Sequence, residues 1–195
     1  MSKKTEQFNM MIVGAGGQGL ITLLQIISEA AIEEGYDVKT SELHGLSQRG
    51  GSVEVHIRFG RKIYSPMVAR GTADLVLGLE EQEILNGVYF ANQRTNFLIN
   101  QLMIPVPLRK PLSENAILNQ LKKVSKNITL VPANKICQEK LGDSVVAGIY
   151  LISLAAFRNL IPLKSESISS AIKKIIPEKY LELNLKTFNL ASENA

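Results

Sequence analysis

The chain has 195 residues, which is enough for one domain with a sizeable apolar core. Its 22 basic and 18 acidic residues give a net charge of +4, and the basic residues stand in scattered pairs that are typical of solvated faces. Aromatic residues make up 6% of the chain and Trp is absent, so the composition offers no stacking platform for single-stranded nucleic acid. We therefore expect no nucleic-acid partner.

The single cysteine, Cys137, excludes an internal disulfide, a multi-thiolate zinc site and an iron–sulfur cluster held by this chain alone. The first eight residues are polar, with no signal-peptide core behind them. The longest apolar run, residues 145–157, is shorter than the ~20 residues that a membrane span needs. These features predict a cytoplasmic protein without membrane contact.

The start of the chain predicts a βαβ unit. Residues 8–13 form an unbroken apolar run, as in a strand that is buried on both faces of a parallel sheet. Residues 17–34 are typical of a mostly apolar helix with one narrow polar stripe, which ends at Gly35. Residues 36–40 give the second strand of the unit.

A glycine-rich turn joins the first strand to the first helix. Gly14, Gly16 and Gly19 follow the G-x-G-x-x-G register, which permits a tight turn, close approach of a ligand to the backbone and close helix packing. Together with Gly17 and Gln18 they form a candidate binding site, because exposed amides and the helix dipole attract a phosphate-class anion. The alternative is a turn whose glycines only let the helix pack.

A self-sufficient oxidoreductase that binds NAD or FAD is a second hypothesis for this turn. In a dinucleotide fold, an acidic residue at the end of the second strand holds the ribose. Asp37 lies at the wrong end of that strand, and Glu42 falls beyond it, in a predicted loop. Dinucleotide binding is therefore the alternative function and not the leading one.

A polar loop with paired glycines is predicted at residues 41–51. Its composition suits contact with a carboxylate or a phosphate, because an arginine offers a bidentate fork and the glycines leave backbone exposed. An ordinary surface connection is the alternative interpretation. The candidate site residues in this loop are Ser47, Gln48, Arg49, Gly50 and Gly51, with His44 and Glu42 as secondary candidates.

The residues after this loop alternate strictly between apolar and polar over positions 52–59, which predicts a half-buried strand. His56 falls on the polar side, where we expect an ordinary surface residue. A turn at residues 60–62 and a short return at residues 63–65 predict an antiparallel hairpin that is appended to the parallel sheet.

The rest of the chain alternates strands and helices and then becomes helical. Pro105, Pro107 and Pro111 argue against a central strand, so residues 101–112 should form an extended connection. The expected strands lie at 73–79, 94–100 and 128–131, and the expected helices start at 80 and 133 and cover 113–126, 144–159, 165–176 and 178–190. The predicted fold is a three-layer α/β domain with a mostly parallel Rossmann-like sheet, an antiparallel hairpin insertion and C-terminal helices, in a single domain over residues 1–195.

Three segments together resemble a known family: Val13-Gly14-Ala15-Gly16-Gly17-Gln18-Gly19, Gln48-Arg49-Gly50-Gly51-Ser52-Val53 followed by His56-Ile57-Arg58, and Ala73-Asp74-Leu75-Val76-Leu77-Gly78-Leu79-Glu80. They are similar to the gamma-type domain of 2-oxoacid:ferredoxin oxidoreductases, and within that family to the indolepyruvate type. The similarity extends to residues 183–188 and so spans nearly the whole chain. The glycine turn alone is not specific for this family. The turn and the Gln-Arg-Gly-Gly-Ser segment together, at this distance in the sequence, are specific for it.

The resemblance implies a subunit role in the oxidative decarboxylation of a 2-oxoacid, here an aryl pyruvate, with coenzyme A as co-substrate. The products would be an aryl acyl-CoA, carbon dioxide and reduced ferredoxin. Thiamine diphosphate, Mg²⁺ and the iron–sulfur clusters would belong to a large alpha-type partner subunit, and ferredoxin would be reached through the complex. This chain would bind no cofactor or metal and would not be catalytic alone; a purely structural partner subunit is a further alternative.

Two features of the residues bear on this implication. Gly142-Asp143, the sole Gly-Asp pair, lacks the following Gly and the Asn expected of a thiamine diphosphate magnesium motif. The chain also has Ala147-Gly148 where the family pattern has an Asn. The first feature supports a partner that holds the cofactor. The second is a departure from the family pattern, and the sequence alone does not determine its effect.

Overall fold

The computed structural model describes residues 5–45, 50–105 and 111–195, and its centre is a six-stranded mixed sheet. In the order β2-β3-β1-β4-β5-β6, three neighbouring strand pairs are parallel and two are antiparallel. The strands are β1 (Gln7–Ala15), β2 (Asp37–His44), β3 (Ser52–Gly60), β4 (Leu75–Gly78), β5 (Asn96–Asn100) and β6 (Ile128–Val131).

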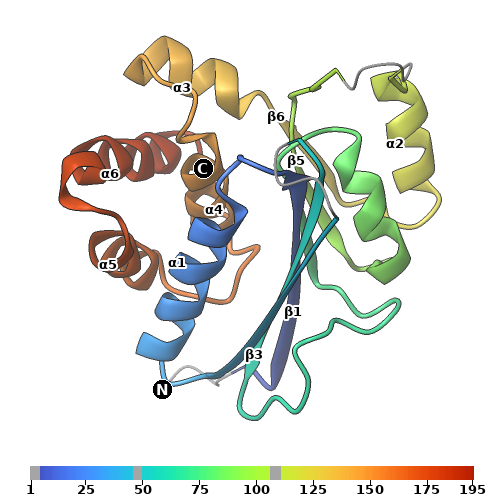
Figure 1. Cartoon of the computed structure of the whole chain (residues 1–195). Helices are drawn as coiled ribbons and strands as arrows, with labels where there is room; N and C mark the ends of the chain where they lie inside the picture. The colour runs from blue at the N-terminus through green and yellow to red at the C-terminus, as the bar shows by residue number, and fades with distance from the viewer. Residues whose placement is uncertain (1–4, 46–49, 106–110) are drawn as a thin grey trace.

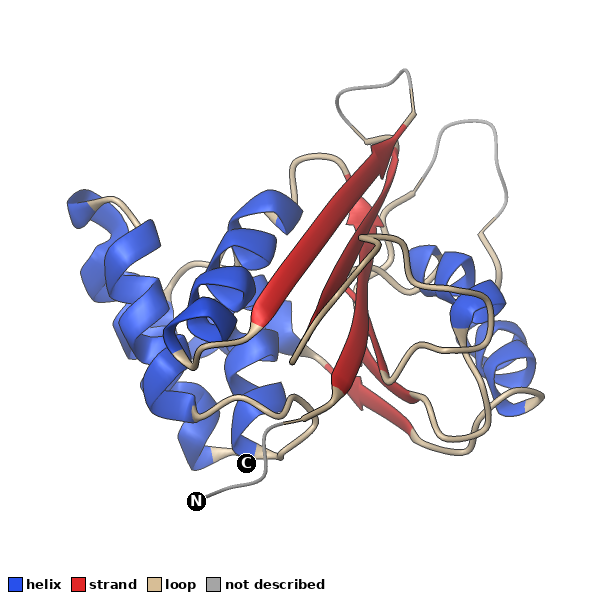
Figure 2. Ribbon diagram, turned by 90° about the horizontal axis from the view of Figure 1, so that it is seen from below, coloured by secondary structure: helices blue, strands red, loops and turns tan. Residues whose placement is uncertain are grey.

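Helices cover both faces of this sheet, which gives three layers (Figures 1 and 2). On one face, α1 (Leu20–Glu33) and α4 (Ala147–Phe157) lie against the sheet, and α5 (Ser165–Ile175) and α6 (Glu178–Glu193) pack on the outside of these two helices. The 3-10 helix η1 (Glu83–Phe90) and α2 (Glu114–Lys122) cover the other face, and α3 (Ala133–Leu141) follows β6. The expected three-layer α/β architecture is confirmed.

The central strand β1 shows why the layers form. Its alternate residues Met10 and Ile12 belong to the core under α1 and α4, whereas Met11 and Val13 belong to the core under η1 and α2. All four side chains are fully buried. An apolar run without polar alternation therefore serves two cores at once, as expected for a strand that is covered on both faces.

Helix α4 is also buried nearly all round, since nine of its eleven residues are inaccessible. It lies between α1 and α6 in the helical layer (Figure 1). No helix in the part of the chain that the structure describes is both long and apolar enough to cross a bilayer. The apolar run at residues 145–157 thus contains a buried core helix, as the sequence indicates.

The hairpin differs from the sequence prediction. Strand β3 inserts between β2 and β1 and is antiparallel to both. Residues 41–44 are therefore part of strand β2 and not of a loop. Residues 63–65 form no strand. The alternation in residues 52–59 identified the strand but could not identify its partner, because either side of a strand can accept one.

The face of β3 that was expected to meet solvent is covered at His56. His56 is fully buried, because the connection after β3 folds back over this face: the amide of Val68 donates to His56 Nδ1 at 3.3 Å, and the rings of His56 and Phe90 meet edge to face. Several helix boundaries differ as well: the element expected from residue 80 is a 3-10 helix from Glu83, and α2 ends at Lys122. Helices α1 and α4 each begin three residues later than predicted.

Candidate functional site

The glycine turn lies at a topological switch point, where the connections that follow two neighbouring parallel strands run over opposite faces of the sheet. Strand β1 leads through α1 on one face, while its parallel neighbour β4 leads through η1 on the other face. Ligands of open α/β sheets bind in the crevice that forms at such a point, outside the carboxyl ends of the strands. The turn therefore occupies the position that the fold favours for a binding site.

The side chain of Gln18 folds back over the turn. Its Oε1 atom accepts a hydrogen bond from the amide of Ala15 at 2.7 Å, and its Nε2 atom donates to the carbonyl of Leu79 at 3.2 Å. A Cβ on Gly14 would lie 2.7 Å from Gln18 Oε1 and 3.1 Å from Leu79 Cβ. Gly14 is thus required by packing, and Gln18 ties the end of β1 to the end of β4.

The turn is also joined to the loop that precedes β3. The amide of Gly16 donates to the carbonyl of Gly51 at 2.8 Å, and the amide of Gly50 donates to the carbonyl of Gly16 at 3.2 Å. The two predicted site segments are therefore in direct contact. Their pairing occupies the amide of Gly16 within the chain. The candidates Ser47, Gln48 and Arg49 lie outside the described residues.

Gly17 and Gly19 are the two turn residues whose amides are open. Both are exposed and have positive φ angles of 102° and 78°, and a Cβ on either would meet nothing within 4 Å. Within the described part of the chain neither amide has a hydrogen-bond acceptor. Helix α1 begins directly after Gly19, has no side-chain cap and has no acid in its first turn, so its positive end is uncompensated.

A cavity of about 380 Å³ opens beside these amides. Its lining comes from the glycine turn, from the carboxyl ends of β4 and β5 and from the start of α4, and it includes Gly17, Gly19, Leu79, Asn100, Asn134 and Ser144. The first half of α4, at Gly148, packs so closely on α1 that a Cβ there would lie 2.9 Å from Leu23 Cδ1. At the Ala147-Gly148 departure, the glycine therefore serves close helix packing.

Sequence reasoning missed Asn100 and Asn134. Asn100 Nδ2 donates to the carbonyl of Leu79 at 3.1 Å and to Asn134 Oδ1 at 2.6 Å, and its Oδ1 accepts from the amide of Ala133 at 3.1 Å. Asn100 is the last residue of β5 and is 2% exposed. A polar residue at the carboxyl end of an apolar strand was the available signal.

The secondary candidates Glu42 and His44 are not part of this cavity. Both are exposed and lie at the end of β2, which β3 separates from β1. In a dinucleotide site the ribose acid comes from the strand beside β1. Here that neighbour is β3, which runs in the opposite direction, so the arrangement does not favour the dinucleotide hypothesis.

An acidic group lies next to Gly51, which pairs with Gly16 of the turn. Ser52 Oγ donates to Glu83 Oε2 at 2.6 Å, and Asn86 Nδ2 donates to the same carboxylate at 2.9 Å. Burial, and then the nearby Glu83 charge, raise the pKa of Glu54. These carboxylates would repel an anion at that side. Among the described residues, the cavity beside Gly17 and Gly19 is lined by one carboxylate, Asp143, whose Oδ1 accepts from the amide of Val145 at 2.8 Å.

The described residues do not suit an iron–sulfur cluster. Cys137 is fully buried in the core, and burial raises the pKa of its thiol to about 11, with the charge of Asp143 as a smaller contribution. Cluster iron is held by several thiolates. Among the described residues there is also no group of three or more His, Cys, Asp or Glu side chains placed to hold a metal ion.

Comparison with known proteins gives the family. The model of the pyruvate ferredoxin/flavodoxin oxidoreductase family matches residues 9–194. The indolepyruvate oxidoreductase subunit IorB of Archaeoglobus fulgidus is 33% identical, with 97% of this chain and 96% of that protein covered, and the IorB subunit of Thermococcus kodakarensis is 31% identical with the same coverage.

Solved structures show the same fold. The gamma subunit of a keto/oxoacid ferredoxin oxidoreductase from Geobacter sulfurreducens matches with a TM-score of 0.68 and 24% identity over 96% of this chain and 98% of that one. A 2-oxoglutarate:ferredoxin oxidoreductase from Magnetococcus marinus matches with a TM-score of 0.70 and 16% identity, over 98% of this chain and 32% of that longer one. The resemblance noted in the sequence is thereby confirmed, and the chain belongs to the pyruvate ferredoxin/flavodoxin oxidoreductase family.

Proposed function

We propose that this chain is the small, cluster-free (beta) subunit of an indolepyruvate-type ferredoxin oxidoreductase. The observation that carries the proposal is end-to-end similarity to IorB subunits, at 33% and 31% identity over 97% of the chain. In the proposed reaction the bond between the carboxylate and the keto carbon of an aryl pyruvate breaks and carbon dioxide leaves. The acyl group forms a thioester with coenzyme A, and the electrons released reduce ferredoxin.

The redox chemistry belongs to a large alpha-type partner subunit in this proposal. In that subunit, thiamine diphosphate with Mg²⁺ would supply the electron sink for decarboxylation, and iron–sulfur clusters would supply electron transfer. The buried Cys137 is unsuited to iron, and Asp143 is engaged locally, since its Oδ1 accepts from the amide of Val145 at 2.8 Å. The single cysteine also suits a reducing compartment, so we place the complex in the cytoplasm.

The contribution of this chain is one wall of a shared site. Gly17 and Gly19 would donate their amides to an anion at the uncompensated start of α1, and Asn100 and Asn134 line the same cavity. The anion would be a phosphate of coenzyme A or an anionic group at the subunit contact. Gln18 and the Gly16–Gly51 pairing hold the turn in shape, and Arg49, next to that pairing in sequence, is the cation expected to complete the site.

The experiment is co-expression of this chain with a large subunit that carries thiamine diphosphate and cluster motifs. The purified complex is assayed for ferredoxin reduction with indolepyruvate and coenzyme A. Activity that needs both chains supports the proposal. The proposal is refuted if the large subunit alone is as active as the complex. It is also refuted if this chain never binds the large subunit.

The anion site has its own test in the same complex. Gly17→Val and Arg49→Ala should raise the KM for coenzyme A if the turn and the loop bind its phosphate, whereas Gln25→Ala, at an exposed position of α1 outside the turn, should not. Unchanged coenzyme A kinetics in the two site variants, with assembly intact, would show that the glycines only pack.

A further inference from the structure

The connection from β3 to β4 displays cations and aromatic rings together at the surface. We define the loop surface as Lys62, Tyr64, Met67, Arg70 and Tyr89, the last contributed by η1. The exposed fraction is 83% for Tyr64, 59% for Tyr89 and 38% for Met67. The Lys62 ammonium lies 5.1 Å from the centre of the Tyr64 ring, and the Arg70 guanidinium lies 5.2 Å from that of Tyr89.

This long connection is held from beneath by buried or half-buried polar groups. Arg58 Nη1 donates to the carbonyls of Ser65 at 2.8 Å and Met67 at 3.2 Å, and the amide of Val68 donates to His56 Nδ1. On the other side, the amide of Ile63 donates to Asp37 Oδ2 at 2.8 Å. The loop surface is thus presented by a backbone that is fixed before any partner binds, and such a surface loses little conformational entropy on binding.

The charge of the loop surface is not neutralised within the chain. Residues 55–73 contain Arg58, Arg61, Lys62 and Arg70 and no acidic residue. In the described residues, Arg61 pairs with Glu6, while Lys62 and Arg70 have no carboxylate oxygen within 4.0 Å. A cation beside an aromatic face is attracted to it, yet it remains available to a carboxylate from another molecule.

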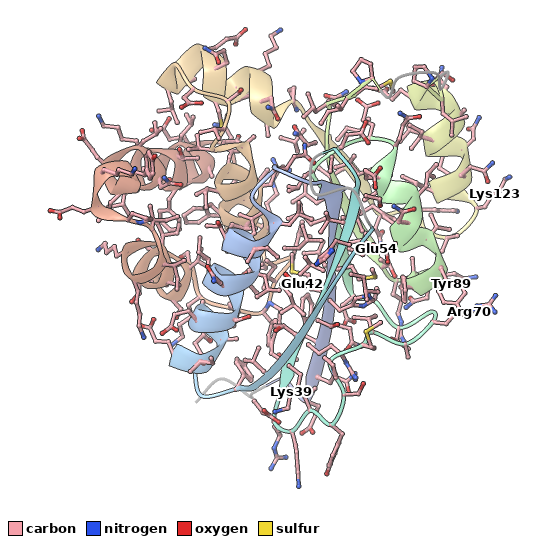
Figure 3. All side chains as sticks on the ribbon, viewed as in Figure 1. Lys39, Glu42, Glu54, Arg70, Tyr89 and Lys123 are labelled. Atoms are coloured by element: carbon pink, nitrogen blue, oxygen red, sulfur yellow. The ribbon has the colours of Figure 1, made fainter. Side chains whose placement is uncertain are left out.

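The loop surface lies away from the candidate site. The connection leads into the amino end of β4, whereas the cavity opens at the carboxyl end of the same strand. Figure 1 shows this connection at the end of the sheet opposite the glycine turn, and Figure 3 shows Arg70 and Tyr89 together at the outer margin of the molecule. The loop surface and the candidate site are thus separate contact regions at opposite ends of the sheet.

We propose that the loop surface is a docking contact for the large partner subunit, through a patch of that subunit that bears carboxylates. This inference rests on the proposed function for the existence of the partner. Tyr, Met and Arg are the residue types that are enriched at interface cores, which favours a lasting subunit contact over a brief encounter with a small electron carrier. Because Lys62 and Arg70 are not neutralised within the chain, electrostatic complementarity favours an opposing patch that carries carboxylates.

The test is made on the complex, with the affinity tag on the large subunit. The variant pair Lys62→Glu with Arg70→Glu reverses the charge of the loop surface, and Tyr64→Ser with Tyr89→Ser removes its rings. Lys179→Glu with Tyr180→Ser is the matched control, because Lys179 lies 4.5 Å from the Tyr180 ring on α6, in the opposite helical layer. The amount of this chain that is retained on the large subunit is measured in low-salt and high-salt washes.

We expect charge reversal to reduce retention at least tenfold in both washes, ring removal to reduce it mainly in high salt, and the control to resemble the wild type. If the charge-reversed variant is retained at the wild-type level, with an unchanged circular dichroism spectrum and Tm, the docking inference is overturned. The proposed function is still upheld in that case if the wild-type complex is active. An equal loss in the control overturns the docking inference too. If the wild-type chain is never retained, both proposals fail.

Discussion

The side-chain amide of Gln18 spans the crevice between two parallel strands, accepting from the amide of Ala15 on β1 and donating to the carbonyl of Leu79 just past β4. A residue in the middle of a ligand-type glycine motif thus uses both ends of its side chain for the protein itself. This explains how a turn with four glycines keeps one conformation: the side chain replaces the strand hydrogen bonds that end where the turn begins.

Gln18→Ala should therefore lower the free energy of unfolding by about 1–2 kcal/mol, because two hydrogen bonds of about 1 kcal/mol each are lost. Urea denaturation measures the difference. Gln25→Ala is the control, since Gln25 is exposed on the same helix and its replacement should change stability by less than about 0.5 kcal/mol. Equal stability of the two variants would contradict the bridging role.

Gly17→Val should destabilise the chain by about 1–2 kcal/mol through backbone strain, since Gly17 has a φ of 102° that β-branched residues avoid. No steric contact contributes, because the space around its absent Cβ is empty. Gly45→Val is the control: its surroundings are also empty and its φ is not in the left-handed region. A thermal melt that shifts equally for both variants would rule out strain at Gly17 as the cause.

The elements that the sequence predicted correctly are those whose signals are local. The apolar run of β1, the glycine turn and the fully apolar α4 each depend on residues close together in the chain. The register between distant strands has no such signal. The insertion of β3 between β1 and β2, and hence the burial of His56, depends on which edge each strand meets and on a connection that folds back over β3.

The candidate site shows the same division. The turn and the paired glycines were recognised as separate motifs, and the structure adds their direct contact through Gly16 and Gly51. Asn100 was passed over because its one signal, a polar residue at the carboxyl end of an apolar strand, does not say which other residues it meets. Its partners are Leu79, just after β4, and Ala133 and Asn134 at the start of α3, which only the folded sheet brings together.

Cys137 should be unreactive in the folded chain. Its side chain is fully buried and the pKa of its thiol is raised to about 11, so the thiolate that attacks disulfide reagents is scarce near neutral pH. We expect no labelling by a chromogenic disulfide reagent in buffer and one thiol per chain in denaturant. Labelling of the native chain at the rate of the denatured one would show that the core around α3 opens readily.

His56 should make stability fall in mild acid. Burial lowers the pKa of His56 below its ordinary value of 6.5, so the unfolded chain binds a proton that the folded chain does not. The contribution is fully present above pH 6.5 and is lost as pH falls below it, at up to about 1.4 kcal/mol per pH unit. Glu54, Asp74 and Glu81 act in the opposite sense, because burial raises their pKa values and the folded chain gains protons there.

The contribution of His56 is isolated by comparison with His56→Asn, whose Oδ1 keeps an acceptor near Nδ1 and does not titrate. Urea midpoints are measured for both proteins at about pH 7.5 and about pH 5.5, on either side of the ordinary histidine pKa. The wild type should lose more stability between these values than the variant, since the carboxylates titrate alike in both. Parallel changes would mean that His56 takes up its proton equally in the folded and unfolded chain, and its burial beneath the Val68 amide would then have no energetic consequence in acid.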